Sequence, residues 1–174
     1  MNNVVALLAE RREEIKAVTK LYKEMSDSLG AESTLKVLCE AIAAEARASG
    51  RKVAPEKREE AGLHHFANLF RSRGVDGGMG GITHEIKDNR LFMTIGRCDY
   101  CQLYRSSGLP AKLSEALCCG REPHYAQGYD ERLKLVLQEA QGERDRSCNL
   151  VYEWAVKPAS ANPETVKKSL RVTN

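Results

Sequence analysis

The segment THEIKDNRLFMTIGRC, residues 83–98, decides the fold class because apolar and polar residues alternate on both sides of a turn sequence. Thr83 to Lys87 and Arg90 to Ile95 each have the two-residue period of a strand. Asp88-Asn89 between them favours a tight turn. The segment therefore predicts a β-hairpin, and the buried side of its second strand would consist of Leu91, Met93 and Ile95.

A second hairpin is predicted further along the chain. In its first strand Leu133, Leu135 and Leu137 would alternate with polar or mixed residues, as in a strand with one apolar face, and a turn would follow at Gly142. Between the two hairpins, residues 98–128 predict two or three short helices, interrupted at 108–110 and at Gly120. The apolar positions of the last strand would be Cys148, Leu150, Tyr152 and Trp154.

The N-terminal part of the chain has the 3.6-residue period of amphipathic helices. Gly30 is a suitable C-cap for the first of them. Glycines occupy five of the eight positions from Gly74 to Gly81, which predicts a mobile loop and a candidate lid. The three helices would run from residue 3 to 29, from Ser33 to Gly50 and from Pro55 to Gly74.

These elements predict an α+β fold in which N-terminal helices pack on an antiparallel sheet of two hairpins, with a helical insert between the hairpins. One domain of residues 1–174 is expected. Within it, 1–74 would be the helical part, 82–157 the hairpin, helix and hairpin part, and 158–174 a polar tail.

Composition excludes several classes of protein. The net charge is only +3 and the charges are interspersed, so nucleic-acid binding has little electrostatic support. No apolar run approaches the roughly 18 residues of a membrane span, and no signal peptide is recognisable. We expect a soluble, cytoplasmic protein with six reduced cysteines and a small-molecule substrate, and the sequence leaves a homo-oligomer open. Motifs for phosphate loops, dinucleotide binding, zinc proteases and serine hydrolases are absent from the sequence.

Cys98 and Cys101 form a Cys-x-x-Cys pattern where a strand should end and a helix begin. A helix N-terminus stabilises a thiolate, so among the six cysteines Cys98 is the one whose predicted position most favours an activated, nucleophilic sulfur. The alternative is that both thiols simply pack between helix and sheet.

A second group of reactive side chains follows at Cys118, Cys119, Arg121, Glu122 and His124. If Cys118 and Cys119 lie on one helix, their side chains point about 100° apart and cannot share a role. A thiol, a base and an anion-binding group are what addition to an electrophilic carbon requires. The alternative is an ordinary solvated helix end. Cys148 would pack in the apolar face of its strand or form the floor of a pocket.

The pattern resembles the L-2-amino-thiazoline-4-carboxylic acid hydrolase family over about residues 83–156. Members have a strand ending in Arg-Cys, a later Cys-x-x-Asp and a terminal hairpin with a further cysteine. Here Cys98, Cys119 and Cys148 would take the three cysteine positions, whereas Glu122 replaces the usual Asp. The residues that carry the resemblance are Arg90 to Cys98, Gly108-Leu109-Pro110, Leu117-Cys118-Cys119, Glu122, Gly128, Gly142 and Cys148.

The resemblance implies hydrolysis of a small ring that contains sulfur and nitrogen, giving N-carbamoyl-L-cysteine. Cys98 or Cys119 would attack the ring carbon or polarise it, and Glu122 or His124 would be the base. We expect the groups that contact the substrate to be Arg97, Arg121 and Cys148.

No cofactor is expected for this hydrolysis. The fold implied is also similar to that of 4-vinyl reductase domains, some of which hold zinc through cysteines. The alternative hypothesis is therefore a non-catalytic sensor of small molecules or zinc. A third hypothesis is a thiol-redox protein. The zinc ligands would then be Cys98, Cys101 and one or two of Cys118, Cys119 and His124.

Overall fold

The computed structural model describes residues 2–75, 79–139 and 147–155, and it confirms the α+β class. Helices form the N-terminal part, and a four-stranded sheet follows. In chain order the elements are α1 (Asn2–Leu29), α2 (Ala31–Val53), the 3-10 turn η1 (Arg58–Glu60), α3 (Leu63–Val75), β1 (Met79–Lys87), β2 (Arg90–Cys98), α4 (Asp99–Arg105), α5 (Ala111–Leu117), the 3-10 turn η2 (Cys119–Arg121), α6 (Glu122–Tyr129), β3 (Leu133–Glu139) and β4 (Cys148–Trp154).

The antiparallel strand pairs of both predicted hairpins are confirmed, and they join through β2 and β4 in the order β1-β2-β4-β3. The turn predicted at Gly142 lies outside the described residues. Leu91 pairs with Tyr152, and Ile95 pairs with Cys148, so the inward faces of the two central strands coincide. One expectation is wrong. The register of β3 shifts between Leu135 and Leu137, and this irregularity leaves the Leu137 side chain 46% exposed instead of buried.

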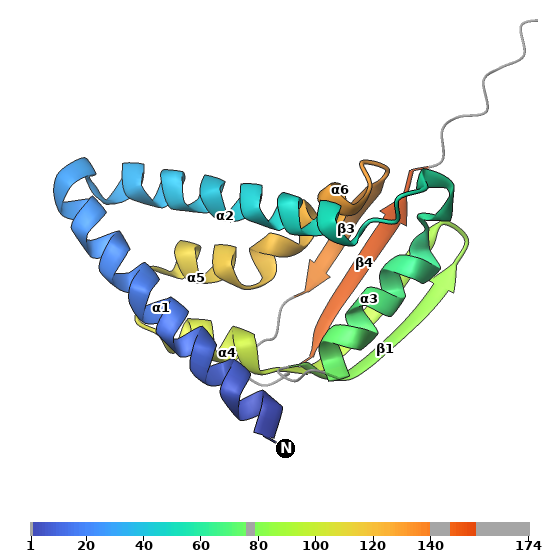
Figure 1. Cartoon of the computed structure of the whole chain (residues 1–174), viewed down its shortest axis with the longest axis horizontal. Coiled ribbons are helices and arrows are strands. Elements are labelled where there is room, and N and C mark those ends of the chain that lie inside the picture. The colour runs from blue at the N-terminus through green and yellow to red at the C-terminus, as the bar shows by residue number, and fades with distance from the viewer. Residues whose placement is uncertain (1, 76–78, 140–146, 156–174) are drawn as a thin grey trace, which may run out of the picture.

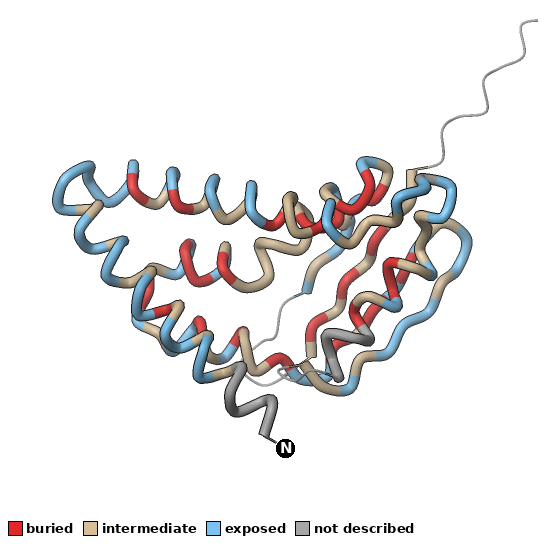
Figure 2. The backbone as a smooth tube through the Cα atoms, in the orientation of Figure 1, coloured by how far each residue is buried: buried red, intermediate tan, exposed pale blue. Residues whose placement is uncertain are grey.

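The helices enclose one side of the sheet (Figure 1). α1 and α2 form a V-shaped pair joined at Gly30, whose φ of 81° lies in the left-handed region that favours glycine. α5 lies between the arms of this V and contacts α2, α4 contacts α5 and α1, and α3 packs on β1 and β2. The buried residues lie mostly on the surfaces that these elements turn toward one another (Figure 2).

The prediction that Gly50 ends the second helix is wrong, because α2 continues to Val53. Gly50 instead allows α2 and α6 to approach each other closely. A Cβ atom on Gly50 would lie 2.2 Å from the Tyr125 carbonyl oxygen, and one on Gly128 would lie 2.1 Å from the Arg47 carbonyl oxygen. These two glycines therefore set the distance between two walls of the candidate site described below.

Two other expected boundaries differ. The third helix begins at Leu63 and not at Pro55, since a 3-10 turn occupies Arg58–Glu60. The predicted glycine loop is wrong at both of its ends: Gly74 belongs to α3, and β1 already contains Gly80 and Gly81. Residues 76–78, and with them any lid, lie outside the described residues, as does the whole predicted polar tail of residues 158–174. Within the described ranges, no helix has both the length and the apolar composition needed to cross a membrane.

Two hydrophobic cores result from this arrangement. The first lies on the sheet and is rich in aromatic rings, including Phe66, Phe70 and Tyr152. The second lies among the helices α1, α2, α4 and α5, and consists of Ile15, Leu38, Tyr104, Leu109, Leu113 and Leu117.

Candidate functional site

A cavity of about 910 Å³ lies between the two cores. Val18 and Ile42 line it from the V-shaped helix pair, and Ile95 and Leu150 line it from the sheet. Further lining residues come from α4, the end of α5, the turn η2 and the beginning of α6, and one each from β1 and β3. We call this space the large cavity.

Five cysteines from separate segments line the large cavity, and we call them the cysteine cluster. Cys98 ends β2, Cys101 follows one turn into α4, and Cys148 opens β4. Cys118 and Cys119 arrive from the end of α5. The Cys101 sulfur lies 2.6 Å from that of Cys118 and 3.2 Å from that of Cys119. Cys98 and Cys148, which the sequence indicated as site residues, therefore both lie at the cavity. Their chemical roles stay predictions.

The expectation that Cys118 and Cys119 point in different directions is wrong. It assumed one continuous helix, but α5 ends at Leu117 and Cys118 has φ −99° and ψ −105°, which is not helical. The two sulfurs consequently lie 3.5 Å apart. Gln138 in β3 fixes this turn by donating a hydrogen bond from Nε2 to the Cys119 carbonyl oxygen at 2.9 Å.

Protons are shared unequally within the cysteine cluster. Hydrogen bonds from Cys101 and Cys118 lower the pKa of Cys98, and hydrogen bonds from the same two groups lower the pKa of Cys119. The pKa of Cys101 is raised, chiefly by its hydrogen bond to Cys118. Cys118 also has a raised pKa: its bond to Cys101 acts in the opposite direction, but bonds to Cys119 and Cys98 and burial outweigh it. The arrangement thus favours thiolates at Cys98 and Cys119, with Cys101 and Cys118 as S–H donors.

Two triads of sulfurs in the cluster have the spacing of a metal-binding set. The Sγ atoms of Cys98, Cys101 and Cys118 all lie within 4.8 Å of one another, and so do those of Cys101, Cys119 and Cys148. Thiolate sulfur is the ligand that soft metal ions prefer.

Oxygen and nitrogen groups complete the wall of the large cavity. Glu122 lines it beside the cysteines and accepts a hydrogen bond from the Tyr152 hydroxyl at 3.3 Å. Arg121 also lines it, with an ion pair to Glu45 of α2. Burial raises the pKa of Tyr104 to about 12, so its phenol stays protonated at neutral pH.

Sequence reasoning missed several lining residues. Arg11 and Glu14 form an ion pair on α1, and Glu45 and Tyr104 lie opposite on other helices. They belong to helices whose only sequence signal is an amphipathic period, and a polar residue beside such a stripe is normally solvated. No local pattern could have found them.

Two predicted residues are not brought to the large cavity. Arg97 contacts Asp99 at 3.3 Å, has a side chain that is 59% exposed, and is not among the described residues that line the cavity.

His124 faces a separate, smaller cavity of about 240 Å³ that it shares with Cys39. Its Nδ1 lies 3.0 Å from an Arg47 nitrogen, and burial together with that guanidinium lowers the pKa of His124. Glu122 is therefore the better placed of the two predicted bases.

Comparison with known proteins gives one family. No curated protein sequence matches the chain at a significant level. The model of the L-2-amino-thiazoline-4-carboxylic acid hydrolase family matches residues 10–152. That range includes most of α1, the sheet as far as Tyr152 and every member of the cysteine cluster. The chain belongs to the L-2-amino-thiazoline-4-carboxylic acid hydrolase family.

Proposed function

We propose that the chain hydrolyses a small ring containing sulfur and nitrogen, as in the conversion of L-2-amino-thiazoline-4-carboxylate to N-carbamoyl-L-cysteine. Membership of the family supports this reaction class. The observation that carries the proposal is that carboxylates, guanidinium groups and five thiols line one cavity, with Glu122 and Arg121 next to the cysteines in sequence. These are the groups needed to activate water, to bind a carboxylate and to contact a sulfur ring.

In the proposed reaction, water adds to the ring carbon between sulfur and nitrogen. The bond from that carbon to the ring sulfur then breaks, and the water oxygen becomes the carbonyl oxygen of the product. One proton of the water ends on the departing sulfur and the other on the ring nitrogen. Glu122 accepts the first proton, and the Tyr152 hydroxyl holds its carboxylate in place.

Arg121 is the proposed partner of the substrate carboxylate. Its guanidinium already has an ion pair with Glu45 on one side, and the planar group has further N–H donors for a second carboxylate. Arg97, which the sequence also indicated, is exposed and serves as the matched control. Arg121→Gln should raise KM for the thiazoline acid about tenfold or more, whereas Arg97→Gln should leave KM unchanged.

Direct attack by the Cys98 or Cys119 thiolate is the second route to the same product. It would pass through an adduct in which the ring carbon is bonded to the enzyme sulfur, and water would later release this adduct. Rapid acid quenching and mass spectrometry of the intact chain distinguish the routes. A mass increase equal to the substrate on Cys98 or Cys119 would favour direct attack over the Glu122 route.

The central test is an assay of the purified chain with the thiazoline acid, with N-carbamoyl-L-cysteine quantified by mass spectrometry. Glu122→Gln should reduce kcat by about 10²- to 10⁴-fold, the typical contribution of a positioned base. Glu40→Gln, on an exposed position of α2, is the control and should retain full activity. Unchanged kcat in Glu122→Gln would refute the role of this base. Tight binding of the thiazoline acid without any product would favour the alternative of a small-molecule sensor.

A further inference from the structure

The two sulfur triads of the cysteine cluster have one member in common, Cys101. Its side chain is 2% exposed and lies at the centre of the cluster, with Cys118 and Cys119 both within 3.2 Å. Cys98 and Cys148 lie on the two outer sides, each in a different triad. A central sulfur between two sets of three is the arrangement of a bridging thiolate ligand.

We propose that the cysteine cluster binds two thiophilic, closed-shell divalent cations, of which Zn²⁺ is the representative, and that the Cys101 thiolate bridges them. Cys98 and Cys118 would complete the first set of ligands, and Cys119 and Cys148 the second. Zinc takes four ligands, so each ion keeps one position toward the large cavity for water or a ligand sulfur.

The distances agree with this assignment after a small adjustment. A zinc–sulfur bond of about 2.3 Å places two sulfurs of a tetrahedral site about 3.8 Å apart. All pairs within each triad lie within 4.8 Å. Cys101 and Cys118, at 2.6 Å, must separate by about 1 Å, and Cys118 follows the end of α5 in a turn that is not part of a helix.

The charge of the cluster is compatible with two ions. All five sulfurs would bind as thiolates, so Cys101 and Cys118 lose their S–H protons to solvent as the ions bind. Two dications beside five thiolates then leave a net charge of −1 to be held away from water. The positive charge of the Arg105 guanidinium favours the thiolate form of Cys119. Arg11 and Arg121 line the same cavity.

The inference does not depend on the proposed hydrolysis, because metal binding is measured without substrate. The chain is first freed of metal under reducing conditions and then titrated with Zn²⁺ against a chromophoric chelator. Wild type should bind two equivalents, Cys98→Ser and Cys148→Ser one each, and Cys101→Ser none with comparable affinity. Cys39→Ser replaces a cysteine outside the cluster and should still bind two. Titration with Co²⁺ should give thiolate-to-metal charge-transfer absorption with the same pattern.

A second measurement uses the unchanged chain, since a serine at buried Cys101 could impair folding. Alkylation by iodoacetamide, read residue by residue by mass spectrometry, should be suppressed by Zn²⁺ at the five cluster positions and not at Cys39. The absence of metal binding by wild type, or of this protection, would overturn the proposal. A single equivalent abolished in all three cluster variants would overturn the bridging role of Cys101 in favour of one ion.

Discussion

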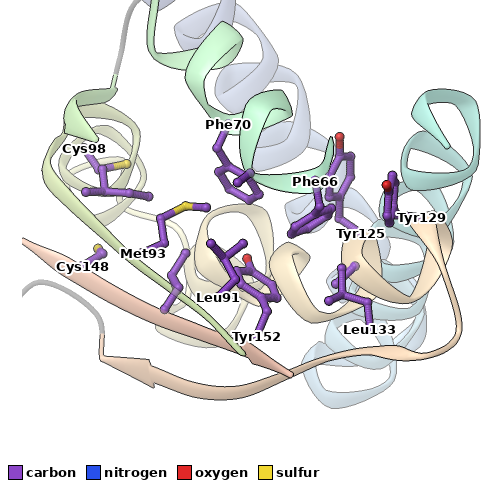
Figure 3. Close-up of a cluster of buried hydrophobic side chains, with 14 of the residues drawn as sticks. Phe66, Phe70, Leu91, Met93, Cys98, Tyr125, Tyr129, Leu133, Cys148 and Tyr152 are labelled. Atoms are coloured by element: carbon purple, nitrogen blue, oxygen red, sulfur yellow. The ribbon is translucent and has the colours of Figure 1, made fainter. Parts of the chain in front are cut away.

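The two ends of the inward sheet face are built from the same two strands, yet one end is solid and the other is hollow. At the first end, Leu91 of β2 and Tyr152 of β4 are completely buried beneath Phe66, whose ring centre lies 5.1 Å from that of Tyr152. At the second end, Ile95 and Cys148 occupy equivalent positions but line the large cavity. Figure 3 shows the aromatic rings around Leu91 and Tyr152, with Cys98 and Cys148 further along the strands.

Side-chain size explains this difference. Strand alternation turns Leu91, Ile95, Cys148 and Tyr152 toward the same side of the sheet. Where large rings from α3 and α6 cover them, the space is filled to the density of a protein interior. At the other end five small thiols are among the lining residues, and space remains for a ligand. One face of a sheet therefore provides both stability and a site, and substitutions at the two ends should have different consequences.

The largest effect is expected at the aromatic end. Phe66→Ala removes a completely buried ring that contacts Phe70 and Tyr152, and it should lower the free energy of unfolding by about 3 to 5 kcal/mol. Urea denaturation measures this loss. Phe92→Ala is the control because Phe92 is 39% exposed on the opposite face of β2, and it should cost less than about 1 kcal/mol. Similar losses in the two variants would contradict the solid packing of this end.

A pair of substitutions on β2 compares the two ends directly. Leu91→Ala should cost about 2 to 5 kcal/mol of unfolding free energy, and Ile95→Ala should fall at or below the lower limit because Ile95 already borders a cavity. Urea denaturation again gives both values. Ile95→Ala should in addition change KM for the thiazoline acid, whereas Leu91→Ala, in protein that remains folded, should not. Equal stability losses with no change in KM would show that the two ends are alike.

The smallest effect concerns His124, which belongs to neither end. Its pKa is lowered in the folded chain, first by burial and then by Arg47, so the unfolded chain binds the proton more readily. The neutral imidazole therefore contributes stability above the unfolded pKa of about 6.5, and this contribution is lost as the pH falls further. The free energy of unfolding should decrease slightly more between about pH 7.5 and pH 5.5 in wild type than in His124→Asn. A larger decrease in the variant than in wild type would show that folding does not lower the pKa of His124.

The elements of the sheet were predictable because their signal is local. Alternation in β2 and β4 placed Leu91 and Cys148 on the inward face, and the change of period at Cys98 marked the joint between strand and helix. Gly50 was misjudged for the opposite reason. Its role depends on α6, which is more than seventy residues away in the sequence. The local sequence does not distinguish a glycine at a helix crossing from a glycine at a helix end.

The composition of the site was only partly predictable. Cys98 and Cys119 were expected near one another from their chemistry, but the contribution of Cys118 depended on one residue with non-helical dihedral angles after α5. His124 was wrongly grouped with Glu122 because the two are close in sequence. α6 turns them to different sides, one toward Arg47 and one toward Tyr152. Proximity along the chain was therefore a poor guide to which residues share the cavity.

The convergence of sulfurs from separate segments on Cys101 is the central claim, and mild oxidation with diamide tests it most directly. Two neighbouring thiols become a disulfide while diamide takes up the two electrons and two protons. Mass spectrometry of peptides from briefly treated, metal-free protein should show Cys101 joined to Cys118 or Cys119, whose sulfurs lie 2.6 and 3.2 Å away. Cys39, in the other cavity, should stay unpaired. Disulfides that omit Cys101, or that form as readily with Cys39, would contradict the account.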